Sequence, residues 1–256
     1  MAPGKAIYAT FRLPEEYIVE EFAMIVREAY PKKEERPPLY LLIHSPGGLV
    51  NSAYVIATVL RETFDKIIAF IPHLAASGAT LLAISCDEII MGDISQLSPI
   101  DPIFTMKDEK GVERTVSALS IISAFRNLEE YFRTRRVEEA AYPYKHFTNS
   151  LSPWVFDEAV RSIDMVERYA RELLEKAGYE KEKIETIITS LIHEATLHGE
   201  AIRWNKAQRF GLKVKHYRED PQYKKAWELM REWLRMYYHH PSLIHIIKYV
   251  LPKEVK

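Results

Sequence analysis

The chain has 256 residues, of which 47% are hydrophobic and 28% are charged, as in an ordinary globular protein of one large domain or one domain with an appendage. Its formal net charge of −1 gives no general attraction to nucleic acid or anionic membranes, so neither is expected as a partner. Collagen-like, disordered and disulfide-scaffold classes are excluded, because glycine is scarce (9 residues) and Cys86 is the only cysteine.

The first hundred residues alternate between predicted strands and predicted helices. Strand-like or continuously apolar runs cover residues 5–13, 39–43, 67–71 and 88–91. Apolar residues at helical spacing predict helices that follow Pro14 and that include residues 53–64 and 81–84. Continuous apolar strands are typical of a parallel sheet that is buried on both faces, so this part of the chain is predicted to have an α/β fold.

After Pro102 the pattern becomes mainly helical. The predicted helices include residues 121–132, 152–178, 184–192, 202–210 and 226–237, and a further strand is predicted over 212–216. Ser152 is the expected N-cap of the long helix and Gly178 its C-terminal residue. We therefore predict an α/β domain over residues 1–218 with a helical insert at about 115–195, followed by a helical extension over 219–256.

The segment 67–86 is apolar enough to raise the question of a membrane span. It carries Pro72, His73, Ser77 and Gly78 at its centre, a pattern that favours a strand, a turn and a buried helix. The N-terminus shows no basic region followed by an apolar stretch. These observations predict a cytoplasmic protein without a membrane span. Cys86 ends the apolar run 81–86, so we expect it to be a buried thiol.

Two short segments are candidates for chemistry. His44–Gly48 and Ala75–Ala79 each follow a predicted strand and precede a predicted helix, which is where open α/β sheets bind ligands. The backbone N–H of Gly78 and one from Gly47 or Gly48 could converge on a developing oxyanion. The alternative is that both segments are tight turns without a chemical role.

At these residues the sequence resembles a known group of proteins. Ser45–Gly48 and Ala75–Ala79, with Gly92–Pro102 and a second patch over His198–Val214, resemble the Clp protease/crotonase superfamily and are most similar to its serine dehydrogenase proteinase branch. The resemblance implies a spiral of ββα units. It also implies a homo-oligomer, such as a trimer, tetramer or hexamer.

The same resemblance implies roles for individual residues. Ser77 would be the nucleophile, and the amides of Gly78 and of Gly48 or Gly47 would form the oxyanion hole. The stretch Gly48, Leu49 and Val50 would pair with an extended peptide substrate. No cofactor and no metal is expected.

The general base is not identified by the sequence. The position of the histidine that Clp proteases use falls at or beside Asp101, and a carboxylate is too weak a base near neutral pH unless its pKa is strongly raised. A desolvated lysine is an alternative, and so is another histidine. The candidates are Lys107, Lys110, Lys145, His73 and His198.

The remaining histidines give weaker signals. His193 and His198 are five residues apart, whereas the zinc protease motif needs two histidines four apart on one helical face. Near the C-terminus, His239, His240 and His245 fit a solvated or interface position better than a metal site.

The first functional hypothesis is therefore a serine hydrolase, specifically an ATP-independent serine peptidase. Because a histidine base is missing, a catalytically silent protein that keeps the fold for peptide binding or assembly is the alternative. A crotonase-like enzyme acting on acyl thioesters is a second alternative, but it leaves the serine at position 77 unexplained.

Overall fold

The computed structural model describes residues 6–11, 15–107, 111–142, 144, 153–194 and 197–239, together with the main chain of 249–250. The chain forms two compact units. One combines residues 1–100 with 169–256, and the other consists of residues 101–168. The division into domains that the sequence suggests remains a prediction.

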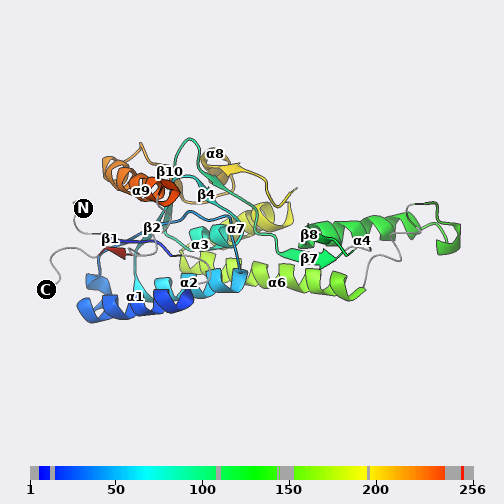
Figure 1. Ribbon diagram of the computed structural model, residues 1–256, viewed down its shortest axis with the longest axis horizontal. Coiled ribbons are helices and arrows are strands. Elements are labelled where there is room, and N and C mark those ends of the chain that lie inside the picture. Colours follow the sequence, from blue (N-terminus) through cyan, green and yellow to red (C-terminus); the bar gives the residue numbers. More distant parts are fainter. Residues whose placement is uncertain are drawn as a thin grey trace. The chain divides into compact units, whose positions relative to one another are not determined.

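The first unit is built on a sheet with strand order β10-β5-β3-β2-β1-β11. Figure 1 labels β1, β2 and β10 of this sheet. Its strands are β1 (Ile7–Ala9), β2 (Leu39–Leu42), β3 (Ile67–Ile71), β5 (Glu88–Met91), β10 (Val214–His216) and β11 (Tyr249–Val250). Neighbouring strands are parallel, except that β11 is antiparallel to β1. All residues of β2 and β3 are buried, which confirms the predicted parallel α/β core.

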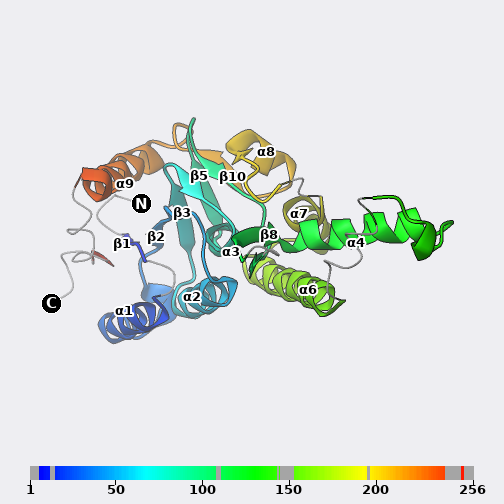
Figure 2. The same ribbon diagram turned by 45° about the vertical axis from the view of Figure 1, so that its right-hand side comes forward.

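Helices cover both faces of this sheet (Figure 2). Helices α1 (Glu16–Ala29) and α2 (Val50–Thr63) lie on one face, and α9 (Pro221–His239) lies on the other. The predicted apolar face of α2 is buried. The helix predicted after Pro14 is confirmed as α1, in which Phe22 and Val26 are fully buried and Ile25 is 37% exposed.

A small second sheet joins the segments after β3 and β5 to a segment that precedes α8. It has the order β4-β6-β9, with β4 (Leu74–Ala75), β6 (Gln96–Leu97) and β9 (Ile202–Arg203). Strand β9 corrects the prediction of a helix from residue 202, because α8 begins only at Trp204 and ends at Arg209. A two-residue strand depends on its tertiary partner, so periodicity does not reveal it.

The helices between residues 153 and 193 largely follow the predicted pattern. Helix α6 (Pro153–Lys176) ends before Gly178, which has the φ of +71° typical of a helix C-terminus. Its predicted N-cap, Ser152, lies outside the described residues. Helix α7 (Lys181–Ile188) continues into a π-helix over Thr189–His193.

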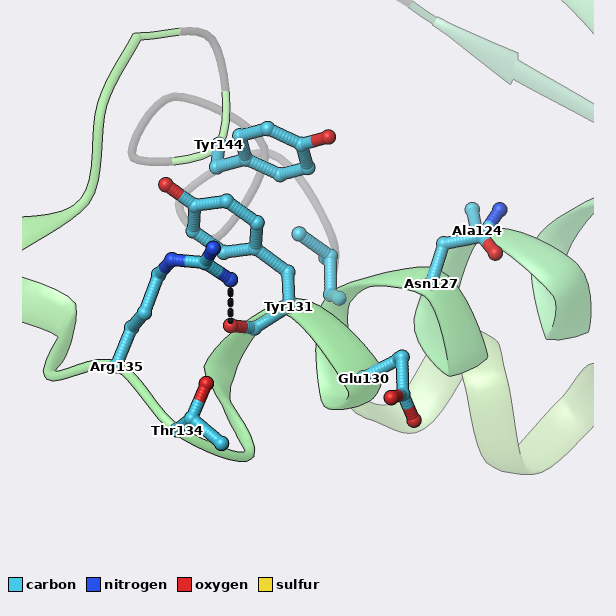
Figure 3. Close-up of a pocket in the computed structure, with 8 residues that line it drawn as sticks. Ala124, Asn127, Glu130, Tyr131, Thr134, Arg135 and Tyr144 are labelled. Atoms are coloured by element: carbon cyan, nitrogen blue, oxygen red, sulfur yellow. Dashed lines mark hydrogen bonds between the residues drawn. The ribbon is translucent and has the colours of Figure 1, made fainter.

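The second unit contains a hairpin that periodicity did not predict. Strands β7 (Ile103–Lys107) and β8 (Glu113–Ser117) pair antiparallel and are partly exposed, so no continuous apolar run marks them. Helix α4 (Ala118–Phe132) follows, with a short 3₁₀ helix over Val137–Glu139 after it. A surface pocket of about 580 Å³ is lined by residues that include Tyr131, Arg135 and Tyr144 (Figure 3).

The apolar segment 67–86 lies at the centre of the first unit. It comprises β3, β4 and the seven-residue helix α3 (Gly78–Ile84), of which every residue is buried. Cys86 is also fully buried, and this burial raises the pKa of its thiol to about 12. Among the helices in the described ranges, none has the length and apolar character that crossing a membrane requires.

Helix α9 is anchored to the sheet by large side chains. Trp227 and Met230 are 4% and 0% exposed and belong to one buried cluster with Tyr40 and Phe70 of the sheet. The Trp227 ring stacks on Tyr217 with an interplanar angle of 4°. The C-terminal helix is therefore a structural layer of this unit.

The end of α9 contacts two histidines at the ends of β2 and β3. The Tyr238 Oη atom lies 3.0 Å from His44 Nε2 and 3.4 Å from His73 Nδ1, and the two imidazole rings are stacked. His44 Nδ1 is buried and has no hydrogen-bond partner among the described residues. These contacts fit a neutral His44 that donates from Nε2 to Tyr238, which in turn donates to His73.

The anchoring role of Trp227 can be measured directly. Trp227→Ala is expected to lower the free energy of unfolding by about 3–5 kcal/mol, because it leaves a cavity between α9 and the sheet. Urea denaturation followed by circular dichroism gives the value. The matched control is Trp154→Ala, since Trp154 is 75% exposed and its loss should change stability by less than about 0.5 kcal/mol. An equal decrease in the free energy of unfolding in the two variants would contradict the anchoring role of Trp227.

The histidine contact predicts a pH dependence of stability. Burial and the neighbouring His73 lower the pKa of His44, so the unfolded chain takes up this proton at a higher pH than the folded chain. The free energy of unfolding should therefore fall as the pH drops through the ordinary histidine value of about 6.5 and be unaffected well above it.

The variant His44→Gln keeps a donor near the Nε2 position and cannot titrate. Urea denaturation should show that the free energy of unfolding falls less between about pH 8 and about pH 5.5 in His44→Gln than in the wild type. His193→Gln, at an exposed histidine, is the control and should keep the wild-type loss. If the free energy of unfolding of His44→Gln falls at low pH as much as that of the wild type, His44 does not cause the pH dependence.

Candidate active site

The two segments singled out in the sequence lie side by side, one after β2 and the other at the end of β4. Ser45 and Ala75 form a parallel bridge between them. The Ser45 N–H donates to the Leu74 carbonyl at 2.9 Å, and the Ala76 N–H donates to the Ser45 carbonyl at 3.0 Å. The two turns are therefore neighbours in the structure, and the convergence of their glycine amides on an oxyanion stays a prediction.

Glycines allow the backbones of these turns to approach closely. Gly47 has a φ of +107°, and a Cβ atom there would lie 2.9 Å from both the Ala76 carbonyl oxygen and Ser77 Cβ. A Cβ atom on Gly78 would lie 3.1 Å from the Gly48 carbonyl oxygen. Since real Cβ atoms rarely approach so closely, a side chain at either position would push the turns apart.

Ser77 occupies a strained backbone conformation immediately before helix α3. Its φ of +51° and ψ of −116° make it the one non-glycine residue with positive φ in the part of the chain that the structure describes. Such a conformation costs about 1–3 kcal/mol and is characteristic of serine nucleophiles on sharp strand-to-helix turns. Ser77 is 6% exposed, and within the described ranges its hydroxyl has no hydrogen-bond partner.

Of the backbone amides near Ser77, some donate hydrogen bonds to nearby side chains and others have no acceptor in the part of the chain that the structure describes. The Ser77 N–H donates to Ser98 Oγ at 2.8 Å, and the Gly47 N–H donates to Ser45 Oγ at 3.1 Å. The N–H groups of Gly48 and Gly78 have no acceptor among the described residues. The roles of Ser45 and Ser98 were not predicted, because side-chain contacts of this kind leave no periodic signal in the sequence.

The predicted peptide-binding stretch lies at the start of α2. Leu49 is 63% exposed and precedes the helix, which begins at Val50. The Leu49 carbonyl accepts the Ala53 N–H at 3.1 Å, which is the first hydrogen bond of the helix. Of the expected stretch, Gly48 and Leu49 lie outside the helix, and Val50 is its first residue.

Two candidate proton acceptors belong to the second unit. Asp101 is 1% exposed, and its Oδ1 atom accepts the Leu119 N–H at 3.2 Å in the first turn of α4. Lys107 is exposed at the end of β7, and its backbone lies opposite Glu113 in the β7–β8 ladder. Lys110 and Lys145 lie outside the described residues.

Two candidate histidines belong to the first unit. His73 contacts His44 and Tyr238, as described above. His198 lies in a turn before β9, and its Nδ1 atom is buried without a hydrogen-bond partner among the described residues. Neither imidazole forms a hydrogen bond with Ser77 in the structure.

In the ranges that the structure describes, no three histidine, cysteine, aspartate or glutamate side chains lie together in a group that could hold a metal ion. His193 is exposed in the π-helix after α7, and of the C-terminal histidines, His240 and His245 lie outside the described residues.

A family of known proteins matches part of the chain. Residues 16–118 match the family described as ClpP-like SDH-type serine proteinases. This range includes both turns and Ser77. It also contains Ser98 and Asp101.

Two proteins of Methanocaldococcus jannaschii are similar to the chain over a longer range. The chain is 29% identical to the uncharacterized protein MJ1495 over 180 residues and 28% identical to the uncharacterized protein MJ0137 over 204 residues. These regions cover 70% and 76% of this chain. The chain spans only 53% and 58% of the lengths of these two relatives.

Among solved structures, the chain is similar to two mutants of the membrane-bound stomatin-specific protease 1510-N, one of them in complex with a substrate peptide. Each is 13% identical, with a TM-score of 0.47 and coverage of 82% of this chain and 72% or 76% of the other. Residues 16–118 are similar to the ClpP-like SDH-type serine proteinases, which confirms the resemblance drawn from the sequence of this region.

Proposed function

We propose that this protein is a serine peptidase in which Ser77 attacks the carbonyl carbon of a peptide bond. The observation that carries the proposal is the strained turn at Ser77, flanked by two backbone amides that have no acceptor among the described residues. The match of residues 16–118 to a serine proteinase family supports the same chemistry.

In this proposal the oxyanion hole consists of the N–H groups of Gly48 and Gly78. The Gly47 N–H is engaged by Ser45 Oγ and the Ser77 N–H by Ser98 Oγ, so neither is available to a substrate oxygen. The contact between the two turns places Gly48 beside Gly78. One preorganised donor of this kind contributes about 3–4 kcal/mol to stabilising the tetrahedral intermediate.

The reaction then follows the pattern of acyl transfer. Ser77 Oγ bonds to the carbonyl carbon while its proton passes to a base, and the carbonyl oxygen becomes the oxyanion. Collapse of the intermediate breaks the C–N bond as the amine takes up a proton, which leaves an acyl-enzyme ester on Ser77. Water hydrolyses this ester and restores the serine.

The base is to be assigned by experiment. Lys107, His73 and His198 carry side chains that can accept the Ser77 proton, and Asp101 lies at or near the family's histidine position. The variants Lys107→Met, His73→Gln and His198→Gln each remove one candidate. The base is the residue whose removal abolishes the pH dependence of labelling at Ser77.

Substrate, assembly and location are part of the same proposal. The substrate is an extended peptide that approaches Gly48 from the side of the exposed Leu49. The protein acts without ATP, as a homo-oligomer (trimer, tetramer or hexamer) in the cytoplasm. The resemblance to the proteinase branch supports the peptide substrate and the homo-oligomer.

A silent peptide-binding protein is the second candidate. It is favoured by one observation, namely that Ser77 Oγ has no hydrogen-bond partner among the described residues. A crotonase-like thioester enzyme would use the same two amides but does not require the serine. The labelling experiment separates these alternatives.

The proposal predicts that a fluorophosphonate probe forms a covalent adduct with Ser77 in the wild type and none with Ser77→Ala or Ser77→Gly. Intact mass spectrometry and peptide mapping identify the adduct. Ser85→Ala is the matched control, because Ser85 is a buried serine at the end of the same helix. An adduct that persists in Ser77→Ala would contradict the assignment, and an unlabelled but folded wild type would favour the silent protein.

The two Ser77 variants also test the strain. Both lack the hydroxyl, but only glycine adopts a φ of +51° without cost. Ser77→Gly is therefore expected to be more stable to unfolding than Ser77→Ala, by about 1–2 kcal/mol. Urea denaturation measures the difference, and equal stabilities would show that the turn is not strained.

A further inference from the structure

We propose that Ser98 is a positioning residue for the nucleophile. Its hydroxyl holds the backbone of Ser77 in the strained conformation and keeps the Ser77 N–H out of the oxyanion hole. The inference rests on the proposed function, because it assigns Ser98 a role in the reaction of Ser77.

Ser98 contacts the nucleophile through a single well-defined hydrogen bond. It follows β6, is 4% exposed, and its Oγ atom accepts the Ser77 N–H at 2.8 Å. The same hydroxyl lies 3.2 Å from the Pro99 carbonyl, to which it donates. A hydroxyl has one proton, so donation to Pro99 leaves a lone pair directed at Ser77.

Thr80 in turn fixes the position of Ser98. The Thr80 Oγ1 atom accepts the Ser98 N–H at 3.2 Å, and it lies 2.8 Å from the Ser98 carbonyl and 2.7 Å from the Ala75 carbonyl. Thr80 is fully buried in α3. One hydroxyl therefore ties the segment after β6 to the helix that begins next to Ser77.

The φ of Ser77 explains why an acceptor is needed at this point. At a φ of +51° the peptide group before Ser77 turns its N–H toward the segment after β6, where Ser98 Oγ is the acceptor. Without Ser98 Oγ this buried N–H would be unsatisfied, which favours relaxation of the turn toward negative φ. Such a relaxation would move the Ser77 hydroxyl relative to the amides of Gly48 and Gly78.

A purely structural role would give a different result from a positioning role. Loss of a buried hydroxyl that acts only in packing lowers stability and leaves the reactivity of folded molecules unchanged. Loss of a positioning group lowers the rate constant of the chemical step in folded molecules, with little change in probe binding. The split between kinact and KI for the fluorophosphonate therefore separates the two roles.

The experiment compares Ser98→Ala with Ser98→Thr and with Ser85→Ala. Ser98→Ala is expected to lower kinact by about tenfold or more and to change KI by less than about twofold. Ser98→Thr retains the acceptor and should stay within about threefold of the wild-type kinact. Ser85→Ala removes a buried hydroxyl that donates to the Leu82 carbonyl, and its kinact should equal that of the wild type.

A second variant covers the case in which Ser98→Ala does not fold. Thr80→Val keeps the side-chain shape but removes the hydroxyl that fixes Ser98, and it should lower kinact by about threefold or more. A wild-type kinact in folded Ser98→Ala, or in Thr80→Val if Ser98→Ala does not fold, would overturn this inference alone. An unlabelled wild type, or labelling that survives Ser77→Ala, would instead overturn the proposed function, and this inference with it.

Discussion

Backbone hydrogen bonds between Ser45 and the segment Leu74–Ala76 hold together the two turns on which the candidate site depends. They lie beyond the ends of β2 and β3 and have a different register, because the strands pair Leu42 with Phe70 whereas the turns pair Ser45 with Ala75. This pairing brings Gly47 against Ser77 and Gly48 against Gly78. A shift in the pairing of Ser45 with Ala75 would separate the amides from the hydroxyl, so the geometry of the site depends on this local pairing.

The rest of the first unit supports a turn that is unfavourable by itself. The strain at Ser77 is about 1–3 kcal/mol, a sizeable part of the about 5–15 kcal/mol by which a typical domain is stable. It persists because Gly47 packs against the Ser77 side chain on one side and Ser98 holds the Ser77 N–H on the other. The buried strands and the layer formed by α9 keep these elements in place.

The sequence predicted the main strands and the two turns because their signals are local. Continuous apolar runs mark β2, β3 and β5, and glycine marks the places where backbones approach each other. The sequence did not predict β4, β6 and β9, since strands of two residues depend on their partners. It also missed the β7–β8 hairpin, whose strands are partly exposed and carry no continuous apolar run.

Within the candidate site, residue types were predictable and hydrogen bonds were not. Gly47 and Gly48 are equivalent as oxyanion donors in the sequence, and only the bond from the Gly47 N–H to Ser45 Oγ distinguishes them. The bond between Ser77 and Ser98 joins residues 21 positions apart, at a separation that no periodicity describes. The match to a proteinase family places both serines in the related region.

The central claim is that Ser77 attacks while Gly48 and Gly78 bind the oxyanion. A crystal structure of the protein with a peptide boronate tests it most directly, because a tetrahedral boronate reproduces the geometry of the intermediate. The account predicts boron bonded to Ser77 Oγ and one boronate oxygen within about 2.7–3.1 Å of both the Gly48 and the Gly78 nitrogen atoms. Boron bonded to another residue, or a boronate oxygen bound by the Gly47 or Ser77 amide, would contradict it.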